Sequence, residues 1–219
     1  MLVGLIILGI VAALMFFGVM GRVYKNCGMP FPLAFAVVGL LIGGAFIPAV
    51  RTSGATVGAA GFIVPLAVSA VFIYLASRRR ELIRSFVATV TAAAVYTSVE
   101  LLLVLVANDS VIVIVQGLLC GFVAYLVGKT ELAALCGVFI GVPLGEVAVG
   151  VTNRFAYGEQ FGIGGASAFN ALIIAAVLSV VLYEVVYAVK YAANKKRRKL
   201  ATEAAEEIDP NEYKKYFDE

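Results

Sequence analysis

A succession of long apolar stretches constrains the fold of this chain more than any other feature. A helix of about 20 apolar residues crosses the roughly 30 Å hydrocarbon core of a membrane, and it satisfies its own backbone polar groups on the way. The 219 residues contain stretches that fit this length at 2–20, 31–50, 59–77, 85–107, 110–128, 132–152 and 168–189. The sequence therefore predicts an all-α polytopic membrane bundle of about seven helices in residues 1–190, followed by a charged tail at 191–219.

The composition supports a membrane protein and excludes several other classes. Hydrophobic residues make up 62% of the chain and charged residues 14%, against about 25% charged residues in soluble domains. A soluble enzyme, a disordered protein and a secreted disulfide scaffold are therefore excluded. The chain has no histidine, which removes His-based zinc and haem sites and Ser-His-Asp triads. Cys27, Cys120 and Cys136 stand singly and are interpreted as small core residues. We expect no metal, no cofactor, no catalytic residue and no nucleic-acid partner, and the sequence does not indicate an enzyme.

The basic residues predict the orientation of the bundle. All but two of the 17 Lys and Arg residues fall in loops after odd-numbered spans or in the C-terminal tail, the exceptions being Arg51 and Arg154. Cytoplasmic loops carry the excess of basic residues. The sequence predicts a multi-pass protein of the cell (inner) membrane with its N-terminus outside and its C-terminus in the cytoplasm. A six-span count, with the turn at 108–110 inside the membrane, would break this alternation.

Four polar residues within the spans are the candidate ligand-binding residues. Glu100, Glu146, Gln116 and Asn170 are all expected in the outer half of the membrane. An ionisable group in hydrocarbon is costly, so each is a functional candidate by default. Glu146 is the principal candidate for binding a cation or a proton, and Pro143 should free a backbone carbonyl near it. The alternative is that protonated or paired glutamates only hold helices together.

Two loops on the predicted outer side are rich in small residues. Residues 51–58 precede the third span, and the segment FGIGGASAF, at 161–169, precedes the seventh. Glycines just ahead of a helix can expose backbone N–H groups to an anion. A flexible lid is the other interpretation of this segment.

Glycines at four-residue intervals mark predicted helix contacts. Such stripes allow two helix backbones to approach closely. They are found at Gly117 and Gly121, at Gly137, Gly141 and Gly145, and at Gly39 and Gly43. The stripes indicate either packing within one chain or the interface of a homo-oligomer.

The tail changes its charge along its length. Five basic residues come first and are expected to contact anionic lipid headgroups of the bilayer: Lys195, Lys196, Arg197, Arg198 and Lys199. An acidic segment follows, in which Asp209 and Pro210 are typical of a helix start. A tail this short cannot form an independent domain, but it can be a docking peptide for a cytoplasmic protein.

Three segments carry a resemblance to a known family. GAAGFIVPL (58–66), GVFIGVPLGE (137–146) and GIGGASAFNALIIAAVL (162–178) resemble the polytopic family of bacteria and archaea catalogued as domain of unknown function 1614. The resemblance covers most of the membrane region, leaves out the tail and implies no established activity. It does imply acidic residues at the positions of Glu146 and Asn170, a layout similar to the GxGD intramembrane aspartyl proteases. This chain departs from that layout, because Asn170 cannot ionise and no Pro-Ala-Leu motif follows the last span.

Three functional hypotheses follow. The leading one is the handling of a small solute or ion through the polar site in the outer half of the bundle. The second is a non-catalytic scaffold or accessory subunit of a membrane complex. The third is a degenerate relative of the intramembrane aspartyl proteases.

Overall fold

The computed structural model describes residues 1–51, 55–76, 79–103, 108–157 and 161–206. The chain divides into two units, Met1–Tyr183 and Glu184–Glu219. Within the described ranges, four helices are long and apolar enough to cross a membrane: α5 (Arg79–Leu103), α6 (Asp109–Gly128), α7 (Glu131–Tyr157) and α8 (Ala166–Glu206). The predicted all-α membrane bundle is confirmed.

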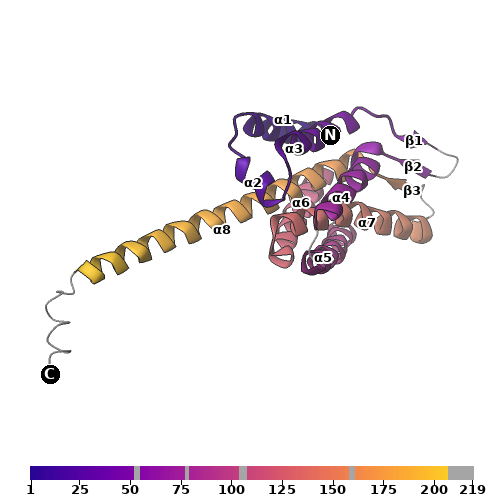
Figure 1. Ribbon diagram of the computed structural model, residues 1–219. Helices are drawn as coiled ribbons and strands as arrows, with labels where there is room; N and C mark the ends of the chain where they lie inside the picture. The colour runs from indigo at the N-terminus through magenta and orange to yellow at the C-terminus, as the bar shows by residue number, and fades with distance from the viewer. Residues whose placement is uncertain (52–54, 77–78, 104–107, 158–160, 207–219) are drawn as a thin grey trace, which may run out of the picture. The chain divides into compact units, whose positions relative to one another are not determined.

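Helix α7 lies at the centre of the first unit. It packs against α5, α6 and α4 (Val64–Leu75), as Figure 1 shows. Side chains along its length, such as Val138 and Val142, are fully buried, and Pro143 is buried inside the helix. A helix that is apolar on all sides is stable either among other helices or in lipid, and the buried side chains show that α7 is packed among helices. The predicted sixth span is therefore the core of the bundle.

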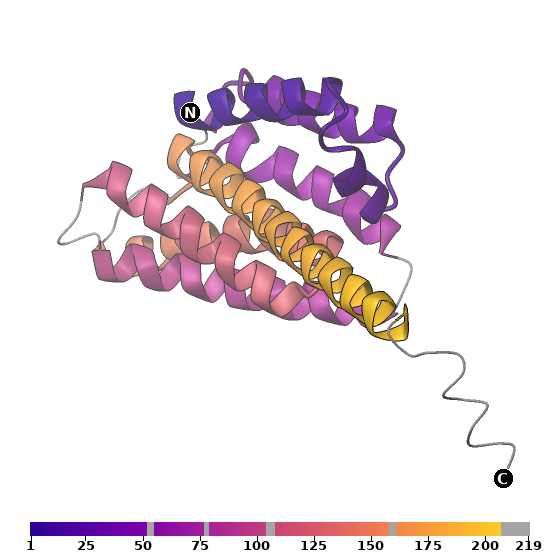
Figure 2. The ribbon, with the colours of Figure 1, turned by 90° about the vertical axis from the view of Figure 1, so that its left-hand side faces the viewer.

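The N-terminal helices are shorter than predicted. Helices α1 (Leu2–Phe16) and α3 (Phe31–Gly44) lie side by side, joined through the short α2 (Gly21–Asn26) (Figure 2). Helix α1 ends before residue 20 because Gly18 adopts a positive φ of 75° and closes the last turn, with Val19 N–H donating to the Leu14 carbonyl.

Helix α3 ends at Gly44 instead of residue 50, ahead of Pro48, which cannot donate a backbone hydrogen bond. A helix of about 15 residues is only about 22 Å long, less than the thickness of the hydrocarbon core. The third predicted span is likewise short, a π-helix η1 (Ala59–Ile63) that continues into α4. The seven-span count and its orientation stay predictions.

A small sheet joins the two loops that were predicted to lie on the outer side. Strand β1 (Val50–Arg51) pairs antiparallel with β2 (Ala55–Val57), which pairs in parallel with β3 (Phe161–Ile163). Val57 lies opposite Ile163 in this register. The sequence analysis did not predict the sheet, whose strands lie side by side in Figure 1. The sheet holds the start of η1 beside the segment that leads into α8.

Several helix boundaries differ from the prediction. Helix α5 begins at Arg79 instead of residue 85, whereas α6 agrees within one residue. Helix α7 continues past residue 152 to Tyr157, which places Arg154 in its last turn, where a positive charge is favourable next to the helix dipole. An apolar stretch marks the part of a helix that lies in hydrocarbon. The helix itself can extend beyond that part, because its backbone hydrogen bonds do not depend on apolar side chains.

The second unit is described up to Glu206, and it consists of the continuation of α8. The predicted limit between membrane domain and tail, at 190, falls within this helix. Lys190, Lys195, Lys196 and Arg197 are exposed, and the rings of Tyr187 and Tyr191 stack with 6.2 Å between their centroids. The short helix predicted from Asp209 lies outside the described residues.

Candidate functional site

Both carboxylate oxygens of Glu146 accept hydrogen bonds from backbone N–H groups. Gly164 N–H donates to Oε2 at 2.5 Å, and Gly165 N–H donates to Oε1 at 3.2 Å. These glycines come directly before α8, where N–H groups have no acceptor within the helix and a negative charge is favourable. The glycine-rich segment does bind an anion, but that anion is a side chain of the same chain. Glu146 therefore fastens the start of α8 to α7.

The backbone around Gly164 can only be built with glycine. Gly164 has a positive φ of 76°, and a Cβ on either Gly164 or Gly58 would collide with the carbonyl oxygen of the other. Gly58 N–H also donates to the Ile163 carbonyl at 2.7 Å. The described part of the predicted lid, from Phe161 onward, is thus held by the sheet, by this contact and by Glu146.

Asn170 also holds the start of a helix. Its Oδ1 accepts a hydrogen bond of 2.9 Å from the backbone N–H of Gly4, in the first turn of α1. Gly4 lies so close to α8 that a Cβ on it would be 2.8 Å from a ring carbon of Phe169. Asn170 therefore anchors α1 on α8.

Glu100 and Gln116 form the other polar contact of the predicted site. Gln116 Nε2, on α6, donates to Glu100 Oε2, on α5, at 2.6 Å, and it also approaches the Tyr96 carbonyl at 3.5 Å. Gln116 is 1% exposed, whereas Glu100 is only half-buried. In the part of the chain that the structure describes, the buried Oε1 of Gln116 has no hydrogen-bond partner.

The structure brings three of the four predicted residues into one region. Buried Tyr96 lies close enough to both Glu146 and Glu100 to interact with their charges. Asn170 hydrogen-bonds to Gly4 instead. Tyr96 was not among the predicted site residues, although it lies one helical turn before Glu100 and so shares a face with it.

Glu146 and Asn170 hydrogen-bond to different backbone groups. Aspartyl protease chemistry needs two carboxyl groups that share a proton and a water molecule. Here the oxygens of Glu146 bond to Gly164 and Gly165, and the amide of Asn170 bonds to Gly4. Both residues stabilise helix starts.

Five of the stripe glycines lie at contacts within the chain. A Cβ on each glycine of the α7 stripe would lie 2.6–2.8 Å from a Cβ of Ala88, Ala92 or Tyr96 on α5. On α6, a Cβ at Gly117 would lie 2.7 Å from Ile174 Cβ, and one at Gly121 2.5 Å from the Ala175 carbonyl oxygen. Gly39 and Gly43 face open space instead.

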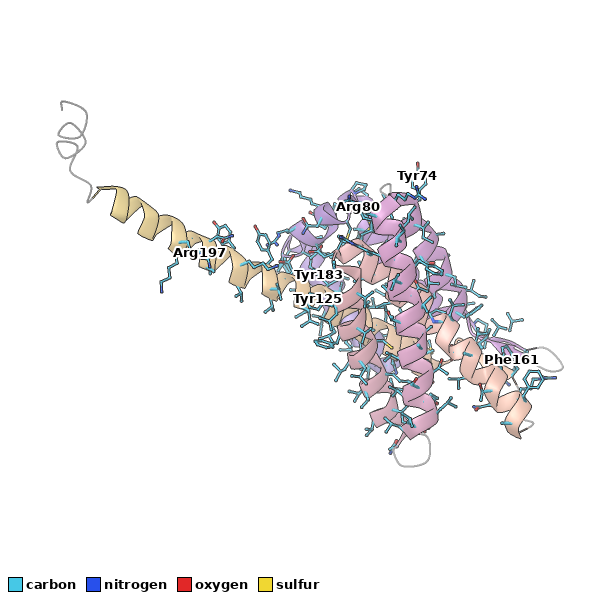
Figure 3. All side chains as sticks on the ribbon, turned by 90° about the horizontal axis from the view of Figure 1, so that it is seen from below. Tyr74, Arg80, Tyr125, Phe161, Tyr183 and Arg197 are labelled. Carbon is cyan, nitrogen blue, oxygen red and sulfur yellow. The ribbon has the colours of Figure 1, made fainter. Side chains whose placement is uncertain are left out.

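The same α6–α8 interface ends in a pair of tyrosines. Tyr183 O–H donates to the Tyr125 carbonyl at 2.9 Å, and the two rings meet edge to face with 4.7 Å between their centroids (Figure 3). This bond satisfies the tyrosine hydroxyl at a helix contact. Together with the glycine contacts, it fixes α8 along α6 as far as the end of the first unit.

A second polar cluster, at the other end of α7, was not predicted. Asn26 Nδ2 donates to Glu131 Oε1 at 3.0 Å, next to the buried Cys27. Burial raises the pKa of the Cys27 thiol to about 12, and the charge of Glu131 and the Cys136 thiol add to this effect. All three cysteines are free and buried, as predicted. Among the described residues, no group of three or more Cys, Asp or Glu side chains is placed to hold a metal ion.

Comparison with known proteins assigns the chain to a family. Residues 30–205 match the YphA-like integral membrane protein family. The chain belongs to this family. No curated protein matches the chain, and no solved structure does. The YphA-like region includes Glu100, Gln116, Glu146 and Asn170, but it leaves out α1, which Asn170 holds.

This assignment confirms a multi-pass integral membrane protein. The family that matches is the YphA-like family. The resemblance to domain of unknown function 1614 and the likeness to GxGD proteases therefore stay expectations. The site described above therefore rests on this chain's own residues.

Proposed function

We propose that this YphA-like protein handles a small solute or ion at the contact between α5 and α6. The observation that supports the proposal is the 2.6 Å hydrogen bond from Gln116 to Glu100, between two helices that can each cross a membrane. A carboxylate at such a position is costly unless it binds something, and intramembrane acids commonly mark ion or substrate paths. Glu146 and Asn170 hold the starts of α8 and α1.

Reconstituted vesicles test this proposal. The purified full-length protein is placed in liposomes that contain an entrapped dye sensitive to pH or to a monovalent cation, and the flux is measured after a gradient is imposed. We expect Glu100→Gln to reduce the flux at least about tenfold, a change that corresponds to about 1.4 kcal/mol. Glu81→Gln makes the same chemical change on the same helix, about 28 Å away along its axis, and should leave the flux unchanged. The proposal would be contradicted if Glu100→Gln, Glu81→Gln and the unmodified protein all gave the same flux.

A scaffold or accessory role is the competing proposal, and the length of α8 favours it. The helix continues to Glu206, past the predicted last span, so the part of the tail up to that residue is helical. We propose that the exposed basic residues of this part contact anionic lipids of the inner membrane and that 201–219 docks a cytoplasmic protein.

If the protein forms a homo-oligomer, the glycine stripe available for the interface is Gly39 and Gly43 on α3, because it faces open space. A scaffold predicts no flux and a co-purifying partner that is lost when 201–219 are deleted.

A further inference from the structure

The unsatisfied oxygen of Gln116 is the starting point for a proposal about the ion. The amide nitrogen of Gln116 bonds to Glu100 and approaches the Tyr96 carbonyl, whereas its Oε1 is buried and, within the described ranges, has no donor. A buried carbonyl oxygen normally has a hydrogen-bond partner. A donor on Oε1 would lock the amide in one orientation. Without such a donor, the contact with Glu100 dominates the orientation of the amide.

The distance between the two side chains suits both protonation states of Glu100. Rotation of the amide by about 180° exchanges its nitrogen and oxygen, so Oε1 would then face Glu100 Oε2. A separation of 2.6 Å is within the range of an O–H···O hydrogen bond and about 0.1 Å below the usual range of N–H···O, a difference that a small movement of either side chain removes. The pair can therefore form a hydrogen bond whether the carboxyl group is ionised or protonated.

The charged groups that face Glu100 are acidic. Asp109, on α6, and Glu146, on α7, are the carboxylates whose charges act on it, and Tyr96 lies on its own helix. These helices are the ones that pack against α5. A proton on Glu100 would remove a negative charge from among negative charges, so cation binding at this position is favoured, and the 2.6 Å separation described above suits a proton in an O–H···O hydrogen bond.

We propose that Glu100 and Gln116 form a proton-binding pair in which the amide turns over when the carboxyl group gains or loses its proton. This proposal rests on the function proposed above, because it names the proton as the ion handled at that site. On uptake, one O–H bond forms on the Glu100 carboxylate, the proton comes from a hydronium ion, and a water molecule is released. The new O–H group then donates to Gln116 Oε1. On release, the O–H bond breaks, a water molecule takes the proton to become a hydronium ion, and the carboxylate again accepts from Nε2.

Infrared difference spectroscopy of the full-length protein in lipid vesicles tests the pair at equilibrium. The pH is stepped between about 4 and about 9, a range that covers the titration of carboxyl groups in proteins. We expect the C=O stretching band of a protonated carboxyl group to appear on acidification, together with a shift of the side-chain amide band of a glutamine. The chain has 14 Asp and Glu side chains, so Glu100→Gln should remove only the Glu100 component of the carboxyl band. It should keep the helices in place, because a second amide can still bond to Gln116. Glu81→Gln should retain the band.

A second variant tests the role of Gln116 while Glu100 is kept. Gln116→Met has a similar volume and no amide, so it should remove the glutamine shift and change the proton affinity of Glu100 about tenfold. A carboxyl band in Glu100→Gln that is identical to that of the unmodified protein, or a titration that Gln116→Met leaves unchanged, would overturn the pair. A Glu100-dependent band without flux in any vesicle would support the pair and refute the transport proposal. Flux without such a band would refute the pair and leave the transport proposal standing.

Discussion

The polar residues of this bundle divide into those that hydrogen-bond to backbone N–H groups and those that hydrogen-bond to another side chain. Glu146 and Asn170 both accept hydrogen bonds from N–H groups near helix starts, so their burial is compensated within the fold. Glu100 has a side-chain amide as its partner, and that amide is itself only half satisfied. Glu146, the principal candidate from the sequence, therefore anchors a helix start, and Glu100 carries the proposed function.

The anchoring role of Glu146 predicts a specific pattern of stability. Glu146→Gln keeps one acceptor oxygen and turns an NH2 group toward a backbone donor, so the free energy of unfolding should fall by about 1–3 kcal/mol. Glu146→Leu removes both acceptors and should cost roughly twice as much. Denaturant titration in mixed micelles measures both. Glu81→Gln serves as the control, expected within about 0.5 kcal/mol of the unmodified protein. A Glu146→Gln protein as stable as this control would show that the two N–H bonds do not stabilise the fold.

Cys27 provides a pH-dependent prediction outside the membrane spans. Its pKa rises from an ordinary value of 9.0 to about 12 in the folded protein. Below pH 9.0 the thiol is neutral in both the folded and the unfolded chain, and its contribution to stability is complete. As the pH rises from 9.0 toward about 12, only the unfolded chain releases the proton, so stability is lost.

Alkylation followed by mass spectrometry checks this prediction. At about pH 8, iodoacetamide should leave Cys27 unmodified in the folded protein and modify it after unfolding, because the thiolate is the reactive form. Rapid modification of Cys27 in the folded protein would contradict the raised pKa.

At the scale of helices, close backbone approach organises the bundle. Every glycine of the α7 stripe faces a residue of α5, and two glycines of α6 face α8. Small residues let helices pack in a membrane, where the lipid is as apolar as the side chains and burial alone gives no preference for protein contacts. Around Gly39 and Gly43 of α3, by contrast, a Cβ would meet no atom of the described residues within 4 Å.

A matched pair of substitutions distinguishes the two kinds of stripe. A Cβ at Gly141 would lie 2.7 Å from Ala92 Cβ and 2.8 Å from the Thr89 carbonyl oxygen, so Gly141→Ala should cost about 1–3 kcal/mol through overpacking. Gly39 has open space around it, so Gly39→Ala should be neutral or stabilise α3 by up to about 1 kcal/mol through helix propensity. The free energy of unfolding, measured in the same micelles, gives the comparison. Equal stability of the two variants would contradict close packing at Gly141.

For the whole molecule, the charge distribution predicts the orientation in the membrane. The sheet joins the loop before η1 to the loop before α8, so both lie on one side of the bundle. The basic residues predict that this side lies outside the cell.

Single cysteines read out this orientation. Cysteine substituted for Ser53, Asp109 or Gly158 should react with a membrane-impermeant maleimide added to intact cells, whereas cysteine at Glu81 should not. The native cysteines are buried and give a low background. Labelling at Glu81 together with protection at Asp109 would mean that the protein is inserted the other way round.

The sequence by itself determined the class of fold and most of its helices. Apolar length and the distribution of Lys and Arg are properties of consecutive residues, so they can be counted before any contact is known. The partners of the polar residues depended on tertiary structure. Glu146 bonds to backbone 18 and 19 residues away, and Asn170 to a residue 166 positions away. A buried carboxylate or amide takes whatever donor the packed helices bring to it, and only the packing decides whether that donor is the chain's own backbone or a ligand.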